Sequence, residues 1–338
     1  MKYDTLVFIG RFQPVHNAHV AIIREAIKLT KELIIIIGSA NQPRTYKNPW
    51  SAIERKMMLM NVLDDMNLGN CRVHIETNED SIYNDNAWAA RVQGIVSKYR
   101  CLGGKTGIIG FKKDESSFYL DMFPQWETEL VNEIEPLNAS NIRDLYFSES
   151  FNVNFIRGVV PFSVQLILEG WVNSPEYAQI IREREYIDNY KKQFVNMAYP
   201  PIFVTVDAVI VWQGHVLMVK RRSEPGKGLW ALPGGFVNAA TDKSIVSAMV
   251  RELREETGLK LPPAQVASAK SKVFDAVERS ARGRTITHAF LIELNTKETP
   301  KVKGMDDAEK ADFIAFNDID PSRCFEDHYE IIKDVVGF

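Results

Sequence analysis

Cysteine is scarce in this chain of 338 residues: only Cys71, Cys101 and Cys324 are present, far apart in the sequence. A set this small, odd and scattered contains no metal-ligand pair and excludes a disulfide-rich secreted scaffold. Long hydrophobic runs are also missing, because the longest dense run, residues 33–37, is far shorter than the roughly 20 residues that span a bilayer. No basic stretch followed by an apolar core opens the sequence, so we expect no secretion signal and a cytoplasmic protein.

The chain also lacks an excess of charge of either sign. Its 41 Lys and Arg against 44 Asp and Glu leave a net charge of −3. Proteins that coat nucleic acid or bind membranes through polybasic patches carry a strong positive excess, so we expect neither partner here. Hydrophobic residues at 45% and charged residues at 25% are typical of a globular protein, and the length predicts two domains. The composition leaves open whether the chain forms a homo-oligomer.

Short apolar strands alternate with helical segments in the first half of the chain. Strands are predicted at residues 5–10, 33–38, 72–76 and 106–110, and helices at 18–30, 51–66 and 86–98. This alternation predicts an α/β domain with a doubly wound parallel sheet, in which helices cover both faces. Two more helices are predicted at 161–171 and 175–194.

The pattern changes after Pro200-Pro201, because two consecutive prolines cannot continue a helix. Alternating β-branched runs at 202–212 and 215–221 flank Gln213-Gly214, a hairpin-like pair. A helix at about 242–257 and strands near 271–275, 285–294 and 312–316 indicate a mixed α+β sandwich. We therefore predict a first domain at 1–172, a helical linker at 173–201 and a second domain at 202–338.

The segment GRFQPVHNAH follows the first predicted strand directly. Doubly wound sheets tend to bind nucleotides at the carboxyl ends of their strands, and the amino end of a helix attracts phosphate. His16 and His19 lie one helical turn apart, so both can face the same phosphates, and Arg11 adds a bidentate anion donor. Such donors stabilise charge on a pentavalent phosphate and supply no nucleophile. A surface turn with two capping histidines is the alternative, and the buried strand before it disfavours that interpretation.

This segment resembles the Gly-x-Phe-x-Pro-x-His-x-Gly-His motif of the nucleotidyltransferase superfamily. The version of the motif with arginine after the first glycine, as at Arg11, resembles that of nicotinamide mononucleotide (NMN) adenylyltransferases of the archaeal type. Ala18 stands where the family usually has glycine. The resemblance implies that Arg11, His16 and His19 are catalytic and that Gly10 and Phe12 bind ATP.

A second segment, LNASNIR at residues 137–143, resembles the family's Ile-Ser-x-Thr-x-Ile-Arg motif, with Asn138 in place of a serine. It implies that Ser140 and Arg143 bind ATP, and Lys113 after a strand is a further expected phosphate contact. Two more segments resemble the parts of the family that bind the nicotinamide side. The residues that we expect to bind NMN are Asn48, Trp50, Arg55, Asn84, Asp85 and Trp88.

The implied reaction converts ATP and NMN to NAD and pyrophosphate. The 5′-phosphate of NMN attacks the α-phosphate of ATP directly, and Mg²⁺ on the phosphates assists. A different nucleotidyltransferase, acting on phosphopantetheine or a pyrimidine nucleotide, is the rival interpretation, and the segments around Trp50 and Trp88 argue against it.

A glutamate-rich helix follows a glycine turn in the second half of the chain. Glu252, Glu255 and Glu256 share one helix face behind the sequence LPGGF. Carboxylates so close repel one another unless a cation lies between them, and Mg²⁺ or Mn²⁺ prefers oxygen ligands. The alternative is a solvated, salt-bridged helix, which the preceding glycine turn disfavours.

This block resembles the Nudix box, and it matches position by position from Arg251 to Leu259. Two more residues separate Gly235 from Arg251 than in the motif, and Lys243 stands where the motif has a glutamate that braces the loop. The resemblance implies a metal site at Glu252, Glu255 and Glu256, with Glu255, Glu256 or Glu309 as general base. We also expect a set of residues to bind ADP-ribose: Arg221, Arg222, Gly234, Gly235, Phe236, Arg282 and Arg284.

The whole arrangement resembles the bacterial and phage bifunctional NMN adenylyltransferase/ADP-ribose pyrophosphatases. It implies hydrolysis of ADP-ribose to AMP and ribose 5-phosphate. A Nudix half that only senses ADP-ribose, or that cleaves another nucleoside diphosphate derivative, is a rival motivated by Lys243 and the altered spacing. A DNA-binding regulator built on a Nudix domain is disfavoured, because the sequence has no helix-turn-helix and no basic face.

Overall fold

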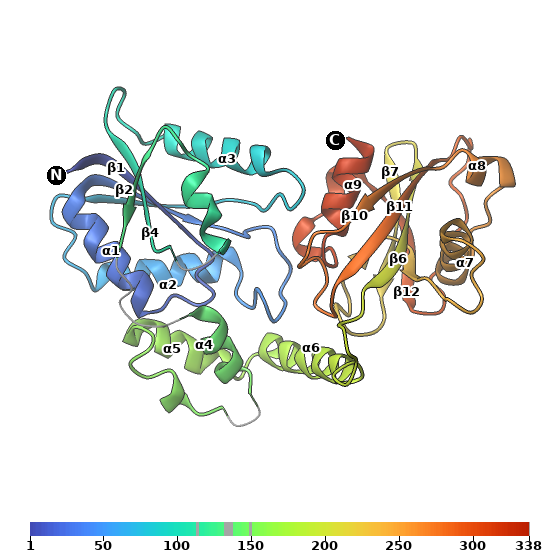
Figure 1. Cartoon of the computed structure of the whole chain (residues 1–338), viewed down its shortest axis with the longest axis horizontal. Coiled ribbons are helices and arrows are strands. Elements are labelled where there is room, and N and C mark those ends of the chain that lie inside the picture. The colour runs from blue at the N-terminus through green and yellow to red at the C-terminus, as the bar shows by residue number, and fades with distance from the viewer. Residues whose placement is uncertain (113–114, 132–137, 149–150, 338) are drawn as a thin grey trace. The chain divides into compact units, whose positions relative to one another are not determined.

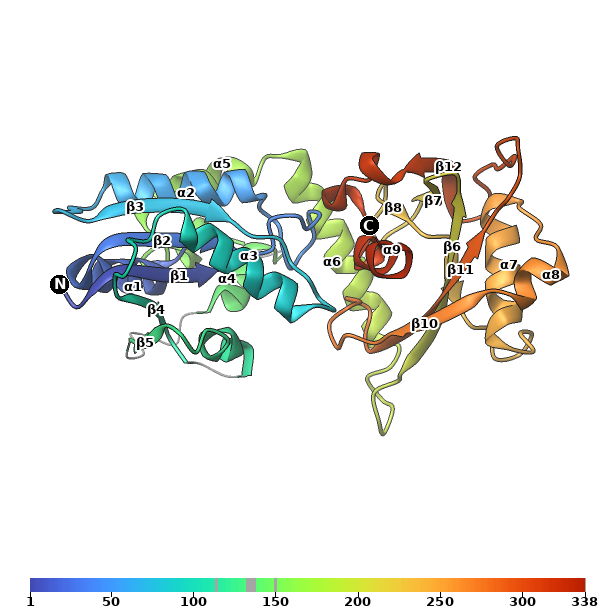
Figure 2. The same ribbon diagram turned by 90° about the horizontal axis from the view of Figure 1, so that it is seen from above.

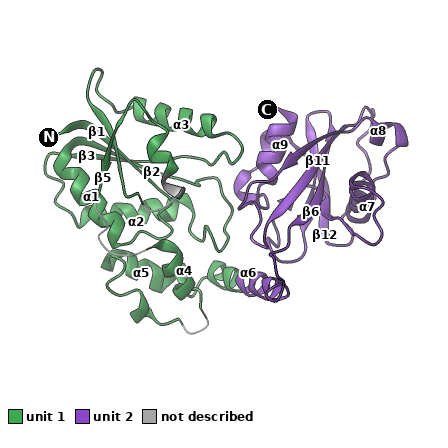
Figure 3. Ribbon diagram, in the orientation of Figure 1, with its two compact units in different colours: residues 1–181 green, residues 182–338 purple. Residues whose placement is uncertain are grey.

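The structure is a computed structural model that describes residues 1–112, 115–131, 138–148 and 151–337. The chain divides into two compact units, residues 1–181 and 182–338 (Figure 3). Among the described residues, no helix is both long and apolar enough to cross a membrane. Each unit has its own sheet and its own core, as the change in sequence pattern predicts.

A five-stranded parallel sheet forms the centre of the first unit (Figure 1). Its order is β3-β2-β1-β4-β5, and the strands are β1 (Tyr3–Gly10), β2 (Thr30–Ile37), β3 (Arg72–Thr77), β4 (Thr106–Gly110) and β5 (Glu127–Leu130). Strand β5 is an edge strand that the sequence pattern did not predict. The order reverses between β1 and β4, and a crevice for ligands is expected at the carboxyl ends of the strands there.

Side chains alternate along the strands, so each face of this sheet has its own core. Leu6 and Phe8 contribute to one core, whereas Val7 and Ile9 contribute to the other. The first face is covered by α1 (Asn17–Leu29), α2 (Ala52–Asp64), α4 (Ala139–Tyr146) and α5 (Phe162–Trp171). The opposite face is covered by α3 (Asp85–Ser97) and the short η1 (Glu115–Asp121), so α2 and α3 lie on opposite sides of the sheet (Figure 1). The predicted doubly wound parallel sheet is confirmed.

Helix α6 (Pro175–Lys192) contains the boundary between the two units. In the first unit, Ile180 is 1% exposed in the core, and the Tyr177 hydroxyl donates to the Tyr146 carbonyl at 2.8 Å. In the second unit, the Glu183 carboxylate accepts from the Gly226 N–H at 3.1 Å. The helix therefore contributes side chains to the packing of both units.

A mixed sheet forms the centre of the second unit, with main order β10-β11-β6-β7-β12. Its strands are β6 (Phe203–Trp212), β7 (His215–Arg221), β8 (Trp230–Ala231), β9 (Gly234–Phe236), β10 (Lys270–Phe274), β11 (Thr285–Glu293) and β12 (Ala308–Ala315). β6 and β11 pair in parallel, and β9 pairs with β6 antiparallel. The hairpin predicted at Gln213-Gly214 joins β6 to β7, and both residues have the positive φ that such a turn requires.

Helices cover both faces of the second sheet. α7 (Ile245–Thr257) and α9 (His328–Val336) lie on opposite sides, and α8 (Pro263–Ala267) follows α7 (Figures 1 and 2). Met249 and Leu253 of α7 pack into the core with Val206 and Ile210 of β6. The same packing places the acidic residues Glu252 and Glu256 of α7 beside β9. The predicted α+β sandwich is confirmed.

Candidate functional sites

The loop after β1 is shaped by a ring that folds back over its own backbone. Phe12 has a φ of +54° and is 1% exposed. A Cβ on Gly10 would lie 2.9 Å from the Cζ atom of Phe12, so only glycine fits beneath the ring. Phe12 also packs against His19, with ring centroids 4.8 Å apart, while Arg11 stays exposed. The two motif residues predicted to contact ATP therefore also set the shape of the loop.

His16 and His19 meet at the amino end of α1. Their rings stack with centroids 3.7 Å apart, and the His16 backbone N–H donates to Nδ1 of His19 at 3.2 Å. Burial, and secondarily the charge of His16, hold the pKa of His19 well below its usual value. His19 is therefore neutral, and because Nδ1 accepts a hydrogen bond, its proton is on Nε2. The sequence motif thus presents a neutral N–H donor beside a helix amino end.

Arg143 of α4 reaches the same loop. Its guanidinium donates to the Gln13 carbonyl at 2.8 Å and to Ser140 Oγ at 3.1 Å, and no described group accepts from its Nε. Burial, and then the positive charge of Arg11, lower the pKa of Arg143 to about 10. Asn138, which replaces the motif serine, still caps α4 by accepting from the Asn141 N–H at 2.8 Å. Arg11 and Arg143 repel each other near the amino end of α1, so this position favours the binding of an anion between the two guanidiniums.

Arg55 lies beneath this loop and is 1% exposed. It donates to four backbone carbonyls, those of Arg11, Gly38, Ser39 and Ser51, at 2.7 to 3.2 Å. Its guanidinium therefore ties the ends of β1 and β2 to the start of α2. The structure places Arg55 as a support for the loop, and its predicted contact with NMN stays a prediction.

Trp50 is also beneath the loop, in an aromatic cluster with Tyr146, Phe147 and Trp171 at centroid distances of 5.5 to 5.9 Å. Its backbone pairs twice with the Gln13 side chain, at 2.8 and 3.0 Å. Gln13 therefore shapes the loop, and the sequence interpretation did not identify it, because its burial is visible only in the structure. Asn48 nearby is 9% exposed, and its Oδ1 has no donor among the described groups.

The remaining residues predicted to bind NMN lie at the amino end of α3. The Asn84 side chain caps this helix by accepting from the Ala87 N–H at 2.9 Å, and Asp85 is exposed. Trp88 is half-buried beside Phe123, with centroids 6.1 Å apart. Because α3 follows β3, this group lies at the carboxyl edge of the sheet, as the His16 loop does. Lys113, the other predicted phosphate contact, lies outside the described residues.

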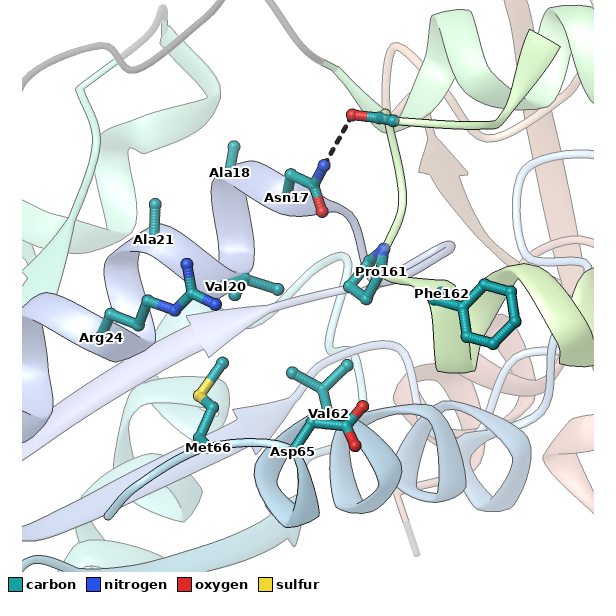
Figure 4. Close-up of a pocket in the computed structure, with 11 residues that line it drawn as sticks. Asn17, Ala18, Val20, Ala21, Arg24, Val62, Asp65, Met66, Pro161 and Phe162 are labelled. Atoms are coloured by element: carbon teal, nitrogen blue, oxygen red, sulfur yellow. Dashed lines mark hydrogen bonds between the residues drawn. The ribbon is translucent and has the colours of Figure 1, made fainter. Parts of the chain in front are cut away.

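A pocket of about 490 Å³ opens on the outer side of α1, between α1, the end of α2 and the start of α5 (Figure 4). Asn17 closes one side by donating to the Gly158 carbonyl at 2.7 Å. The pocket is lined by Ala18 but not by His16, His19, Arg11 or Arg143. It is therefore separate from the predicted triphosphate residues.

In the second unit, β9 passes directly over the acidic face of α7. The Gly234 N–H donates to Glu256 at 3.0 Å, and a Cβ on Gly235 would lie 2.6 Å from Glu252 Cδ. Burial, and then the Glu252 and Asp307 carboxylates, raise the pKa of Glu256 to about 8. Burial raises the pKa of Glu252 as well, and Glu255 is exposed. Gly235 is required because the strand backbone lies against the Glu252 carboxylate, and Gly234 is required because a Cβ there would lie 2.1 Å from the Val206 carbonyl oxygen.

Two of the four predicted arginines converge near this acidic face. The Arg221 guanidinium lies 4.1 Å from the centre of the Phe325 ring, and that of Arg282 lies 4.9 Å from the Phe236 ring. Burial, and then the charge of Arg282, lower the pKa of Arg221, which also interacts with Glu256. Arg222 instead donates to the Ala308 carbonyl at 3.0 Å, and Arg284 pairs with Asp275 at 3.8 Å.

Comparison with known proteins identifies both halves. A NUDIX domain model matches residues 201–335, and a cytidylyltransferase-like model matches residues 7–131. A nicotinamide/nicotinic acid mononucleotide adenylyltransferase of Acinetobacter baylyi is 37% identical over 53% of this chain and 92% of its own length. An ADP-ribose pyrophosphatase of Methanocaldococcus jannaschii is 38% identical over 39% of this chain and 71% of its own length.

Solved structures also match along the full length of the chain, and one of them carries bound ligands. This one is a bifunctional NMN adenylyltransferase/ADP ribose pyrophosphatase from Francisella tularensis, complexed with AMP and a Mn ion. The sequence identity is 33%, the TM-score is 0.89, and the match covers 99% of each chain. The chain belongs to this bifunctional family.

In this member of the bifunctional NMN adenylyltransferase/ADP ribose pyrophosphatase family, the Nudix carboxylates suit a hard divalent cation. Burial raises the pKa values of Glu252 and Glu256, so a bound cation would favour their ionised forms. Carboxylate oxygens are the ligands that Mg²⁺ and Mn²⁺ prefer. Within the described ranges, no three His, Cys, Asp or Glu side chains are already arranged as a metal site. Arg251 instead pairs with Glu252 at 2.8 Å and with Glu255 at 2.9 Å.

Behind the Nudix centre of this family member lies a buried polar network that sequence reasoning missed. Asp207, 4% exposed, accepts from Thr287 Oγ1 at 2.5 Å, and a Cβ on Gly234 would lie 2.7 Å from its Oδ1. His328 accepts from the Leu232 N–H at 2.8 Å, and burial lowers its pKa to about 3. Asp207 and His328 therefore contact β9 and the residues just before it. The sequence offered little indication of this network, because its members are single polar residues in otherwise apolar segments.

A second part of the network is a buried ion pair, in which Arg279 donates twice to Asp327 at 2.8 and 2.9 Å. Glu309, a predicted candidate for the general base, is exposed and pairs with Lys220 at 3.4 Å. Glu255 and Glu256 lie on the helix that carries the Nudix motif, and the choice of general base among the three stays a prediction.

Proposed function

We propose that the first unit transfers the adenylyl group of ATP to NMN, which gives NAD and pyrophosphate, and that the second unit hydrolyses ADP-ribose to AMP and ribose 5-phosphate. The observation that carries this proposal is the match along the full chain to one bifunctional enzyme, together with two separate, chemically different sites. Mg²⁺ or Mn²⁺ is the proposed divalent cation in both reactions. We further propose that the protein acts in the cytoplasm and binds neither nucleic acid nor membranes.

In the first unit, the proposed chemistry needs positioning and charge stabilisation only. A phosphate oxygen of NMN forms a bond to the α-phosphorus of ATP, and the bond to the β-phosphate oxygen breaks as pyrophosphate leaves. We propose that the neutral Nε2–H of His19 and the guanidinium groups of Arg11 and Arg143 bind the phosphates as charge develops. No covalent intermediate on the enzyme is needed. Mg²⁺ would neutralise phosphate charge when bound.

In the second unit, we propose that Arg221 and Arg282 hold the diphosphate of ADP-ribose beside the acidic face of α7. Glu252, Glu255 and Glu256 would hold the divalent cation, which lowers the pKa of water when bound. Phe325 and Phe236 would help to hold the two guanidiniums, because Arg221 lies over the Phe325 ring and Arg282 over the Phe236 ring. Glu255 or Glu256 is the proposed general base.

The proposal is tested by chromatography of the products of two incubations with Mg²⁺ or Mn²⁺. ATP with NMN should give NAD and pyrophosphate, and ADP-ribose alone should give AMP and ribose 5-phosphate. Incubation with phosphopantetheine or a pyrimidine nucleotide in place of NMN is the control for acceptor choice. Absence of NAD would refute the first activity. Tight binding of ADP-ribose without release of AMP would replace the second activity with a sensing role.

A further inference from the structure

The chain between β9 and α7 departs from the Nudix motif at two positions that the structure relates to each other. The loop is two residues longer, and Lys243 replaces the bracing glutamate. Lys243 is exposed and lies before Ser244, which caps α7. Position 243 therefore supplies no carboxylate to Arg251. Arg251 nevertheless needs a fixed partner, because its other contacts are with the proposed metal ligands Glu252 and Glu255.

The longer loop folds into a tight turn between Asn238 and Asp242. The Asp242 N–H donates to the Asn238 carbonyl at 2.9 Å, and the Thr241 N–H donates to the same carbonyl at 3.2 Å. The Asn238 side chain accepts from the Ala240 N–H at 3.0 Å, and the Asp242 carboxylate accepts from the Asn238 N–H at 2.8 Å. The turn absorbs the additional residues and brings Asp242, rather than residue 243, back to α7.

The Asp242 carboxylate binds Arg251 at two points. Nε of Arg251 donates to Oδ1 at 2.9 Å, and Nη2 donates to Oδ2 at 2.7 Å, while the Asp242 side chain is 4% exposed. This is the bidentate geometry, with two parallel hydrogen bonds, in which an arginine and a carboxylate bind most specifically. The same guanidinium donates to the Phe236 carbonyl at 3.2 Å, to Glu252 and to Glu255. One arginine thus joins the turn, the end of β9 and two acidic side chains.

We propose that Asp242 is a positioning residue for the Nudix centre: it fixes Arg251, and through Arg251 the carboxylates of Glu252 and Glu255. The longer turn and the acid shifted by one residue together replace the glutamate that the chain lacks at position 243. This inference rests on the proposed function in one respect, namely that Glu252 and Glu255 are metal ligands. Without Asp242, the released guanidinium would pair more fully with those two carboxylates and compete with the cation for them.

The test uses the full chain with Asp242→Asn, which keeps the shape and the hydrogen bond to Asn238 but removes the charge. Mn²⁺ binding without substrate is measured by titration calorimetry, and AMP release is measured separately. Groups that orient metal ligands typically change metal affinity by about 10- to 100-fold when they are lost, and we expect a loss in that range. The rate of AMP release should fall with it, and NAD synthesis by the first unit should stay within about twofold of the wild type.

Two further variants separate positioning from general destabilisation. Lys243→Glu alone should leave Mn²⁺ affinity unchanged, because residue 243 faces solvent. Asp242→Asn combined with Lys243→Glu should stay impaired, and recovery would overturn the claim that the turn places the brace at position 242. Asp242→Glu, which keeps the charge, should restore part of the affinity and therefore shows that a loss in Asp242→Asn is not a folding defect.

An Asp242→Asn protein with the Mn²⁺ affinity and AMP release of the wild type would overturn the proposal. A wild-type protein that binds Mn²⁺ but releases no AMP from ADP-ribose would instead refute the proposed hydrolase function. In that case the comparison of Mn²⁺ affinities would still decide the role of Asp242.

Discussion

One hydrogen bond sets which form of His19 the nucleotidyltransferase loop presents. The backbone N–H of His16 occupies Nδ1 of His19, and burial disfavours the charged ring, so the neutral ring carries its proton on Nε2. A neutral donor of this kind binds phosphate oxygens without changing its protonation state near neutral pH. The role that the motif implies for His19 is therefore consistent with its surroundings.

Replacement of His19 by alanine should lower the kcat of NAD synthesis by about 10²-fold or more, because one donor to the developing charge is lost. The rate of AMP release from ADP-ribose, measured on the same protein, should stay within about twofold, because His19 belongs to the other unit. Loss of both activities in a protein that remains folded would contradict the assignment of two separate sites.

Glu256 shows the opposite electrostatic situation, a carboxyl group whose pKa is raised to about 8 by burial and by neighbouring carboxylates. The ordinary pKa of a glutamate is 4.5, so between about pH 4.5 and pH 8 the Glu256 carboxyl group stays protonated in the folded protein, whereas it would be ionised in the unfolded chain. A cation must bind the ionised form. Below about pH 8, Mn²⁺ binding should therefore release a proton, and its affinity should rise as the pH rises toward 8.

The measurement is titration calorimetry with Mn²⁺ in buffers of different ionisation enthalpy, between pH 6 and pH 8.5. Glu256→Gln should abolish this proton release and lower AMP formation by about 10²-fold or more, while NAD synthesis is retained. A wild-type affinity for Mn²⁺ that does not change with pH would show that Glu256 is not the titrating ligand.

At the scale of elements, the connection between a strand and the next helix decides where each motif side chain goes. In the first unit, the β1–α1 connection turns on Phe12, whose buried ring covers Gly10 and contacts His19. In the second unit, β9 lies so close to Asp207 and Glu252 that only glycine fits at positions 234 and 235. In both units, a glycine makes room for a side chain that shapes the site: the Phe12 ring over Gly10 and the Glu252 carboxylate beside Gly235.

Gly10→Ala should push the Phe12 ring away, because the new Cβ would lie 2.9 Å from Cζ and the ring has no free space. We expect a loss of stability of roughly 1–3 kcal/mol, as for other overpacked sites, together with reduced NAD synthesis. Gly94→Ala in α3 is the matched control, since nothing lies within 4 Å of its Cβ, and it should raise stability by about 0.5–1 kcal/mol. Thermal unfolding of both variants checks the signs, and a Gly10→Ala protein as stable and active as the wild type would contradict this account.

At the scale of the whole molecule, helix α6, which lies in the predicted helical linker, contributes side chains to the packing of both units. Ile180 and Tyr177 complete the first unit, while Tyr190 packs against Phe203 in the second with centroids 5.8 Å apart. The predicted division at residues 172 and 202 would remove these contacts from both sides.

A chain truncated after residue 172 should therefore be less stable than one truncated after residue 192. Burial of one large aliphatic side chain contributes roughly 1.5–3 kcal/mol, so loss of Ile180 and of the Tyr177 contact should lower the melting temperature by several degrees. Calorimetry of the two fragments compares them directly. Equal melting temperatures would show that α6 adds nothing to the first unit and would favour the boundary predicted from sequence.

The sequence by itself determined the fold class, the order of the two domains and the residue types of both centres. Hydrophobic periodicity and the two motifs are local, so His16, His19, Arg143 and the glutamates of α7 can be read directly along the chain. Side chains that act from another element cannot be found in this way. Arg55 and Trp50 match the family by position, yet tertiary packing buries them beneath the His16 loop.

Only the tertiary structure decided how departures from the motifs are accommodated. Lys243 indicated a missing brace, and the fold supplies Asp242 instead, because a closed turn moves the next carboxylate into place. It also brought together Arg221 and Arg282, which are distant in sequence, and left Arg222 and Arg284 with other partners. The physical reason is that charge pairing and burial depend on distance in space, which a sequence pattern does not contain.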